Sequence, residues 1–169
     1  MSRPELHVIC GLPGTGKTTL AKRLEANLPG VRLCPDEWIT AVFPSRRHGY
    51  ISDTYRDAIE ELQWRLGKRM LAANCSVIIE WGTWGRRERD RLRDEGRAVG
   101  AKAVLHYLDA PFDEIRRRLL ARNDRLPEGE IYMPPEGLDG WLAEWSALIE
   151  RPSADELTHW EAAYGPGLG

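Results

Sequence analysis

The chain has 169 residues, 42% of them hydrophobic and 30% charged, which is typical of one soluble globular domain and excludes a disordered or membrane-embedded protein. A formal net charge of −2 disfavours a protein whose main partner is a nucleic-acid backbone. The three scattered cysteines predict free thiols, and no run approaches the roughly 18 apolar residues of a membrane helix, so we expect a cytoplasmic protein without a cysteine–histidine metal site.

The most informative stretch is Gly-Leu-Pro-Gly-Thr-Gly-Lys-Thr at 11–18, which follows an apolar run at 6–10 and precedes a helical pattern of apolar residues at 20–28. A strand, a glycine-rich loop and a helix in this order are typical of a P-loop. The glycines let successive backbone N–H groups point inward, and the start of the helix adds a positive dipole end. The predicted nucleotide-binding residues of this loop are Gly11, Pro13, Gly14, Thr15, Gly16, Lys17, Thr18 and Thr19.

Two residues of the loop have specific expected roles. The ammonium group of Lys17 is expected to reach the β- and γ-phosphates of ATP as a point charge. The hydroxyl of Thr18 is expected to hold Mg²⁺. ATP and Mg²⁺ are therefore the predicted cofactors.

A second short strand is predicted at 31–34, and a helix is predicted to begin at Asp36 and to end before Pro44. The polar loop that follows carries Arg46 and Arg47. A long helix is then predicted over 54–74. The residues expected on its apolar face are Ile59, Leu62, Leu66, Met70 and Leu71.

A continuous apolar run at 77–79 predicts a buried parallel strand, and it leads into Glu80-Trp81-Gly82. The helix predicted over 86–96 alternates arginines with acidic residues, which is typical of a solvated helix face. A fourth strand is predicted at 103–108 and a further helix at 111–123.

The segment 122–135 contains Arg125 and several prolines, and we interpret it as a small lid at the mouth of the site. The helix predicted over 138–149 carries an aromatic stripe that we expect to pack in a core and not to stack on a ligand. The tail is expected to hold one short helix near Leu157 and Trp160 and to fray at 165–167.

Strands that alternate with helices predict an α/β, P-loop NTPase fold, with a four- to five-stranded parallel sheet, helices on both faces and a small arginine-bearing lid. Residues 1–169 are expected to form one domain of this kind. Ligands of such sheets bind at the carboxyl ends of the strands, where Asp36 and Glu80 are predicted to lie. One pocket is therefore expected to use the loop and both carboxylates.

Phosphoryl transfer needs a base for the acceptor hydroxyl and cations for the transferred phosphoryl group. Asp36 is the predicted general base or acceptor-orienting carboxylate, and capping of its own helix is the alternative role. Arg118 and Arg122 lie four residues apart on one helical face and are expected to contact the same nucleotide. Arg125 is predicted to act as an arginine finger from the lid.

Glu80 has three open interpretations: an orienting group for Mg²⁺ through water, a contact to the acceptor, and a structural partner for an arginine. Trp81 and Trp84, with the loop that carries Arg46 and Arg47, are candidates for the lining of an acceptor pocket. Buried packing is an equally open role for either tryptophan.

The sequence resembles the small P-loop kinases of the group that contains chloramphenicol phosphotransferase, zeta-toxin-like kinases and bacterial polynucleotide kinase domains. The matching stretches are 11–18, 35–38, 79–82 and 106–123. The resemblance implies that Asp36 activates the acceptor hydroxyl and that Arg118 and Arg122 belong to the nucleotide site on the lid side. The group usually has aspartate where this chain has Glu80.

These observations predict a phosphotransferase that moves the γ-phosphate of ATP to a hydroxyl of a small molecule such as an antibiotic, a nucleoside or a sugar nucleotide. A polynucleotide 5′-hydroxyl kinase is the alternative enzyme, with nucleic acid as a second-choice partner. A regulatory switch that binds ATP without catalysis is the alternative from another class of protein. A membrane partner is not expected.

Overall fold

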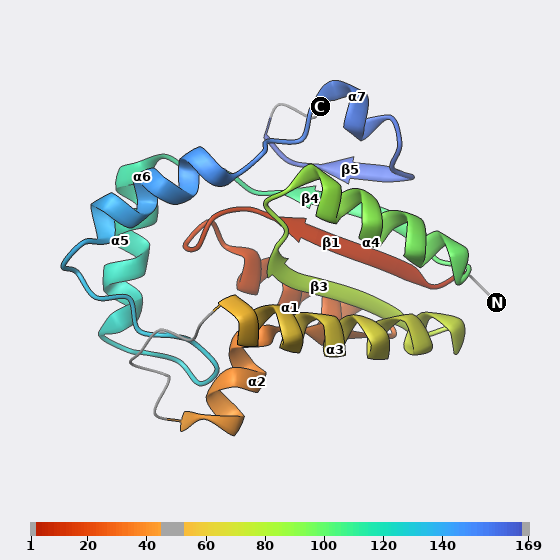
Figure 1. The fold of residues 1–169 in the computed structure, drawn as a ribbon, viewed down its shortest axis with the longest axis horizontal. Coiled ribbons are helices and arrows are strands. Elements are labelled where there is room, and N and C mark those ends of the chain that lie inside the picture. Colours follow the sequence, from red (N-terminus) through yellow and green to blue (C-terminus); the bar gives the residue numbers. More distant parts are fainter. Residues whose placement is uncertain (1–2, 45–52, 167–169) are drawn as a thin grey trace.

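The computed structural model describes residues 3–44 and 53–166 (Figure 1). The strands are β1 (Glu5–Cys10), β2 (Gly30–Leu33), β3 (Ser76–Gly82), β4 (Lys102–Tyr107) and β5 (Ala162–Tyr164). The helices are α1 (Lys17–Asn27), α2 (Pro35–Val42), α3 (Asp53–Ala72), α4 (Arg86–Ala98), α5 (Phe112–Asn123), α6 (Leu138–Leu148) and α7 (Ala154–Leu157). None of the helices in these two described ranges is long and apolar enough to cross a membrane.

The five strands form one parallel sheet in the order β2-β3-β1-β4-β5. Alternate residues of β1 point to opposite faces: Leu6 and Val8 join the core under α3 and α4, whereas Ile9 packs with Ala21 of α1 on the other face. Parallel strands with helices on both faces confirm the predicted α/β fold. The chain reversals after the strands therefore gather at one edge, beside α5 and α6 (Figure 1).

The predicted buried face of α3 is partly wrong. Leu62 and Leu66 are exposed, whereas Trp64 and Gly67 are buried. Gly67 faces the sheet so closely that an added Cβ would lie 3.1 Å from Cδ1 of Leu33. The helix is rotated to bring its smallest residue against the sheet, with the large indole of Trp64 beside it in the core.

The prediction that α4 is a solvated charged helix is also wrong on one face. Arg89, Leu92, Arg93 and Gly96 are buried, at the spacing of one helical face. An added Cβ at Gly96 would lie 2.5 Å from Cδ2 of Leu6 in β1, so the helix lies directly on the sheet. The two buried arginines are each held by carboxylates.

The C-terminal segment contains a fifth strand that was not predicted. After α7 the chain adds β5, which pairs in parallel with β4 from Val104 to His106. The aromatic stripe of α6 packs as predicted, because Trp141 and Trp145 contact a second core formed by Leu12, α5 and α6. Cys10 and Cys34 are buried free thiols, and Cys75 is a partly buried one.

Candidate functional site

The glycine-rich loop between β1 and α1 has the shape of a phosphate cradle. Gly14 has φ +80° and an added Cβ would lie 3.0 Å from Cγ of Leu119 in α5, so a larger residue does not fit there. Gly16 precedes α1 with φ +101°, and no side chain caps the helix. The first backbone N–H groups of α1 therefore have no side-chain acceptor at the cap, and they are available for an anion.

Lys17 is turned back into this loop. Its Nζ donates to the carbonyl oxygen of Leu12 over 3.0 Å. Burial lowers the pKa of the ammonium group, and the carboxylates of Glu80 and Asp36 partly offset that effect, while Arg122 adds to it. The charges of Glu80, Asp36 and Arg122 thus all act on the ammonium group of Lys17, so these four residues belong to one site.

Glu80 joins the loop to the sheet. Its Oε1 accepts a hydrogen bond from Oγ1 of Thr18 over 2.5 Å, and its Oε2 accepts from Nη1 of Arg32 over 2.8 Å. Both ion-pair partners are almost fully buried, and burial raises the pKa of Glu80. Glu80 thus does have an arginine partner, and it also touches the hydroxyl that is expected to hold Mg²⁺.

Arg32 is a site residue that the sequence analysis missed. Its guanidinium also contacts Glu37 of α2 over 2.5 Å and Glu25 of α1 over 3.5 Å. Burial lowers the pKa of Arg32, but the hydrogen bonds and charges of Glu37 and Glu80 outweigh that effect and raise it. It lies in the middle of β2, where a charged residue between Val31 and Leu33 gives only a weak signal of function.

Asp36 points to α3 and does not cap α2. The N-cap of α2 is Cys34 without a side-chain hydrogen bond, so the capping alternative is wrong. Oδ1 of Asp36 instead accepts from Nη2 of Arg56 over 2.6 Å. Among the described residues, Oδ2 makes no hydrogen bond, so one oxygen of an oriented carboxylate is left for an acceptor.

An acidic wall of Asp57, Glu60 and Glu88 continues from Arg56 along α3 to α4. Nη1 of Arg56 lies 3.9 Å from Oε1 of Glu60. Burial and then the neighbouring Glu88 raise the pKa of Glu60 to about 8. Burial also raises the pKa of Glu88. None of these residues was predicted, because α3 and α4 are brought together only by the sheet.

The two candidate tryptophans have structural partners. Nε1 of Trp84 donates to the carbonyl oxygen of Gly11 over 3.2 Å, and its ring packs against Trp145, so it lies behind the cradle. Nε1 of Trp81 donates to Oε1 of the buried Gln63 over 2.9 Å. The described contacts favour packing for Trp84 and leave the half-buried Trp81 as a lining candidate.

The arginines of α5 approach the cradle from the lid side. Nη1 of Arg118 donates to the carbonyl oxygen of Gly14 over 3.3 Å. Arg122 donates to Glu130 over 2.7 Å and to the carbonyl oxygen of Ile131 over 3.2 Å. Its Nε is buried and has no partner among the described residues. The guanidinium groups of Arg118 and Arg122 are therefore placed to bind an anionic ligand at the cradle.

The lid segment 122–135 begins at the end of α5, folds back on it and reaches α2. Nδ2 of Asn123 donates to the carbonyl oxygen of Met133 over 2.6 Å. An added Cβ at Gly129 would lie 2.5 Å from Cγ of Glu37. Arg125 is exposed on this segment, and its role as an arginine finger stays a prediction. The predicted contacts of Arg46 and Arg47 lie outside the described residues.

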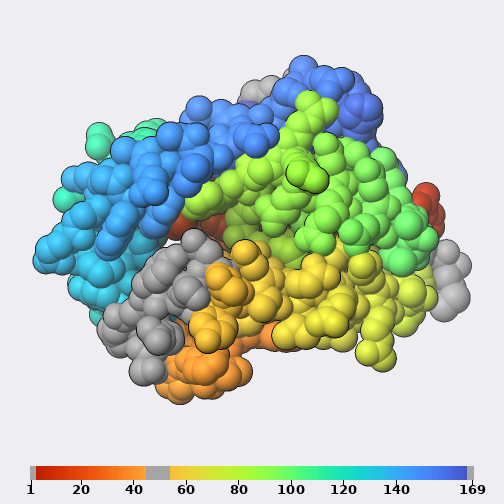
Figure 2. Space-filling model, in the orientation of Figure 1, coloured from red at the N-terminus to blue at the C-terminus, as the bar shows by residue number. Residues whose placement is uncertain are grey.

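A cavity of about 770 Å³ opens beside the cradle, between α1 and strands β4 and β5. Residues of the cradle, of α1 and of α5 line it, among them Gly16, Thr19 and Arg118. His106 and Tyr164, whose stacked rings have centroids 5.3 Å apart, also line it and were not predicted. A second hollow, between α6 and the start of α3, shows atoms of the N-terminal segment on its floor (Figure 2).

The chain matches the family model described as AAA domain (AAA_33) over residues 6–144, so it belongs to that family. No curated protein sequence matches it. The family match covers the cradle, Asp36, Glu80 and the arginines of α5.

Solved structures at low identity have the same fold. Kti12 of Chaetomium thermophilum with ADP-AlF3 is 20% identical at a TM-score of 0.66, and the match covers 95% of this chain and 87% of that one. The APS kinase CysC of Mycobacterium tuberculosis with AMPPNP and APS is 16% identical at a TM-score of 0.60, covering 100% and 92%. A chain of the Pnkp1/Rnl/Hen1 RNA repair complex is 19% identical at a TM-score of 0.65, covering 88% of this chain and 46% of that one. The predicted P-loop NTPase fold is confirmed.

Proposed function

We propose that this protein is an ATP-dependent kinase that transfers the γ-phosphoryl group of ATP to a hydroxyl group of a small molecule. The observation that carries the proposal is the glycine-rich cradle, with Lys17 turned into it and Thr18 hydrogen-bonded to Glu80 of β3. The cradle supplies the donor half of a two-substrate site, and Asp36 supplies the acceptor half.

The donor half fits a polyanionic nucleotide. The uncapped start of α1, the ammonium of Lys17 and the guanidinium groups of Arg118 and Arg122 surround one small region. The buried, unpaired Nε of Arg122 is a donor that a phosphate oxygen would satisfy. The cavity beside the cradle has room for the base and sugar of the nucleotide.

The residues also fit a magnesium ion bound with the nucleotide. A hydroxyl and a carboxylate are oxygen ligands of the kind that Mg²⁺ prefers, and Thr18 and Glu80 present both at the cradle. Mg²⁺ would neutralise charge on the phosphates. Thr18 would hold the ion directly. Glu80, which is hydrogen-bonded to Thr18, would contact the ion through a water molecule.

In the acceptor half, Asp36 takes the proton of the acceptor hydroxyl. The oxygen of that hydroxyl forms the new bond to the γ-phosphorus. The bond from that phosphorus to the bridging oxygen of ADP breaks, and ADP leaves with the negative charge. Arg56 orients the carboxylate of Asp36 through its 2.6 Å contact. Lys17 and Arg122 balance the charge on the transferred group, and Arg125 would do so on lid closure.

The described surroundings of Asp36 favour an uncharged or cationic small acceptor. Asp57 and Glu88 follow Arg56 along the wall of the site, and as carboxylates they would repel a chain of phosphates, whereas Glu60, with its pKa raised to about 8, is largely uncharged near neutral pH. A polynucleotide 5′-hydroxyl kinase is the second candidate, because the chain shares its fold with part of the RNA repair complex. Such an enzyme would bind oligonucleotides with a strong dependence on salt.

The test is a transfer screen with γ-labelled ATP over antibiotics, nucleosides, sugar nucleotides and oligonucleotides, repeated with Asp36→Asn. We expect the variant to bind ATP within about two-fold of the native affinity and to lose about a thousand-fold in transfer. Asp113→Asn makes the same change at an exposed carboxylate of α5 and should leave transfer unchanged. Full transfer by Asp36→Asn would refute the base role, and ATP binding without any acceptor would favour a regulatory switch.

A further inference from the structure

The turn after β3 holds the first residue of the phosphate cradle. The backbone N–H of Gly11 donates to the carbonyl oxygen of Gly82 over 3.1 Å. The carbonyl oxygen of Gly11 accepts from Nε1 of Trp84 over 3.2 Å. Both backbone groups of Gly11 are therefore fixed by the turn, and the position of the turn sets where the cradle begins.

This turn has an unfavourable backbone conformation. Thr83 has φ +44°, in the left-handed region that a β-branched residue rarely adopts. Its hydroxyl donates to the carbonyl oxygen of Ile9 over 3.1 Å. A conformation of this kind persists only when the surrounding structure holds it in place.

Arg89 of α4 holds the turn in this conformation. Its Nη1 donates to the carbonyl oxygens of Thr83 and Trp84, each over 2.9 Å. Its Nη2 donates to the carbonyl oxygen of Glu150 over 2.8 Å. The side chain is fully buried, and a planar guanidinium is the one side chain that can bind several carbonyl groups at fixed angles in this way.

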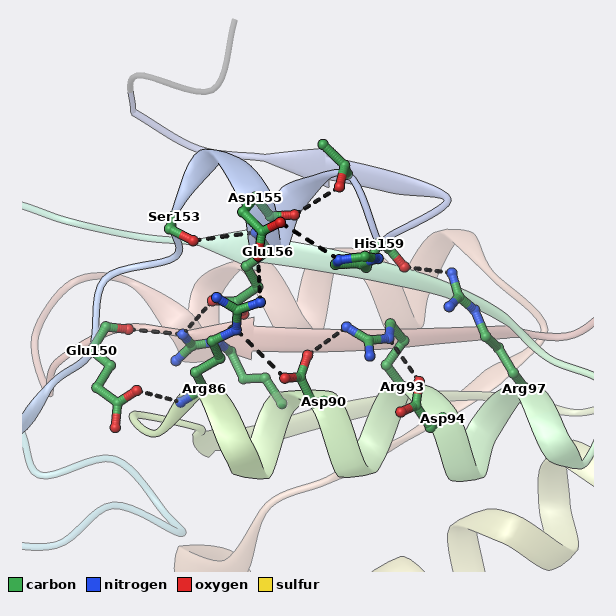
Figure 3. A network of polar contacts seen from close by, with 12 residues as sticks. Arg86, Asp90, Arg93, Asp94, Arg97, Glu150, Ser153, Asp155, Glu156 and His159 are labelled. Atoms are coloured by element: carbon green, nitrogen blue, oxygen red, sulfur yellow. Dashed lines mark hydrogen bonds and ion pairs between the residues drawn. The ribbon is translucent and has the colours of Figure 1, made fainter.

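Glu156 of α7 neutralises Arg89 inside the protein. The ion pair is bidentate, with Nε to Oε1 at 2.6 Å and Nη2 to Oε2 at 2.8 Å, and both side chains are buried. Figure 3 shows Glu156 and Glu150 beside the start of α4, with a row of further ion pairs along the helix. The segment after α6 is thus connected to the turn through the buried guanidinium of Arg89 and through the backbone N–H of Glu150, which donates to the carbonyl oxygen of Trp84 over 2.9 Å.

We infer that Arg89, fixed by Glu156, is a positioning residue for the phosphate cradle. It acts through the turn at Thr83 and Trp84 on Gly11, and so it sets the direction of the backbone N–H groups that face the phosphates. The inference rests on the nucleotide binding of the proposed function. It adds that the C-terminal segment, outside the matched family range of 6–144, is needed for nucleotide affinity.

Arg93 offers a matched control one turn further along α4. It is also buried, it pairs with Asp90 and Asp94, and it lies over the ring of Trp160 at 5.7 Å. It makes no hydrogen bond to the turn after β3 among the described residues. Substitution of either arginine is expected to lower the stability of the protein, whereas only substitution of Arg89 is expected to change the geometry of the cradle.

The experiment compares Arg89→Lys with Arg93→Lys in the full chain, using ATP with Mg²⁺ as the ligand in calorimetric titrations well below both unfolding temperatures. Arg89→Lys should weaken ATP binding by about ten-fold or more, because the ammonium group of lysine has too few donors, at the wrong positions, to bind three carbonyls and both oxygens of a carboxylate together. Arg93→Lys should stay within about two-fold of the native affinity at a similar loss of thermal stability.

Two milder variants keep the test decisive if Arg89→Lys does not fold. Trp84→Phe removes only the donor to Gly11, and Glu156→Gln keeps the shape of the ion pair without its charge. Each should weaken ATP binding by about three- to ten-fold, and together their effects should be less than additive since they act through one turn.

Native affinity in Trp84→Phe and Glu156→Gln, or equal losses in Arg89→Lys and Arg93→Lys, would overturn the positioning role. These outcomes leave the proposed function intact if the native protein binds ATP. Absence of ATP binding by the native protein would overturn both.

Discussion

The hydroxyl of Thr18 and the carboxylate of Glu80 are joined by a 2.5 Å hydrogen bond, which connects the start of α1 to the buried end of β3. The same carboxylate is paired with Arg32 of β2. One side chain therefore links the site expected for Mg²⁺ to the interior of the sheet, and its two roles can be separated by mutation.

Glu80→Gln should raise the Mg²⁺ concentration needed for half-maximal nucleotide binding by about ten-fold, since a carboxamide attracts metal-bound water less than a carboxylate does. It should also lower the free energy of unfolding by about 1–3 kcal/mol, because the buried Arg32 loses a charged partner. Titration of a fluorescent ADP analogue at varied Mg²⁺ concentration measures the first effect.

Glu25→Gln is the matched control for that variant. Glu25 also pairs with Arg32, at 3.5 Å, but it is half exposed and does not touch Thr18. Glu25→Gln should leave the Mg²⁺ dependence of nucleotide binding unchanged and should lower the free energy of unfolding by less than about 1 kcal/mol. An identical Mg²⁺ dependence in both variants would show that Glu80 serves Arg32 alone.

Lys17→Met should abolish measurable nucleotide binding, with a loss of at least about a hundred-fold, because the cradle loses the cation that now rests on the carbonyl of Leu12. The variant should still fold, and its free energy of unfolding should rise slightly, since a buried ammonium with a lowered pKa is replaced by an apolar side chain. Lys22→Met, on the exposed side of α1, is the control for charge. Native ATP affinity in Lys17→Met would contradict the donor half of the proposal.

Strands β1 to β4, the cradle and the parallel sheet could be predicted because each depends on a local sequence pattern: an apolar run, a glycine pattern or a helical period. The short edge strand β5 was not predicted. The contacts of Asp36 could not. Its partner Arg56 lies 20 residues away on α3, and the two meet only because α2 and α3 are neighbours in the fold. The capping role that a local view suggests for Asp36 was the wrong alternative.

The arginines of α4 show the same limit more clearly. Alternating charges suggested a solvated helix, yet Arg89 is buried against Glu156, which lies 67 residues further along the chain. A buried guanidinium needs a carboxylate and several carbonyls, and these come from three separate segments. The spacing of Arg89, Leu92, Arg93 and Gly96 on one face was the only local signal.

The raised pKa of Glu60 predicts how stability depends on pH. Burial and Glu88 raise the pKa of Glu60 from 4.5 to about 8, so between these values the folded state binds more protons than the unfolded state. The contribution of this group to stability therefore falls as pH rises through that window. Glu60→Gln should match the native protein near pH 5 and exceed its free energy of unfolding by about 1–3 kcal/mol near pH 9.

Denaturant unfolding across that pH range measures the difference. Glu61→Gln removes a neighbouring exposed carboxylate and should follow the native curve. A Glu60→Gln curve parallel to the native curve at every pH would mean that Glu60 is not held in a buried, proton-binding environment.

The contact between the lid segment and α2 predicts a specific cost at Gly129. Its φ of +80° disfavours any residue with a Cβ, and that Cβ would lie 2.5 Å from Cγ of Glu37, which itself holds Arg32. Gly129→Ala should therefore lower the free energy of unfolding by about 1–2 kcal/mol and speed tryptic cleavage after the exposed Arg125. Thermal unfolding and limited proteolysis check the two effects.

Gly140→Ala provides the opposite case on the adjacent helix. Nothing lies within 4 Å of an added Cβ at this position of α6, so the change should stabilise the protein by about 0.5–1 kcal/mol through helix propensity. If Gly129→Ala were as stable as Gly140→Ala and equally resistant to trypsin, the lid segment would not rest on Glu37 in solution. A clear difference between the two variants would support the contact between the lid segment and α2, the helix that also carries Asp36.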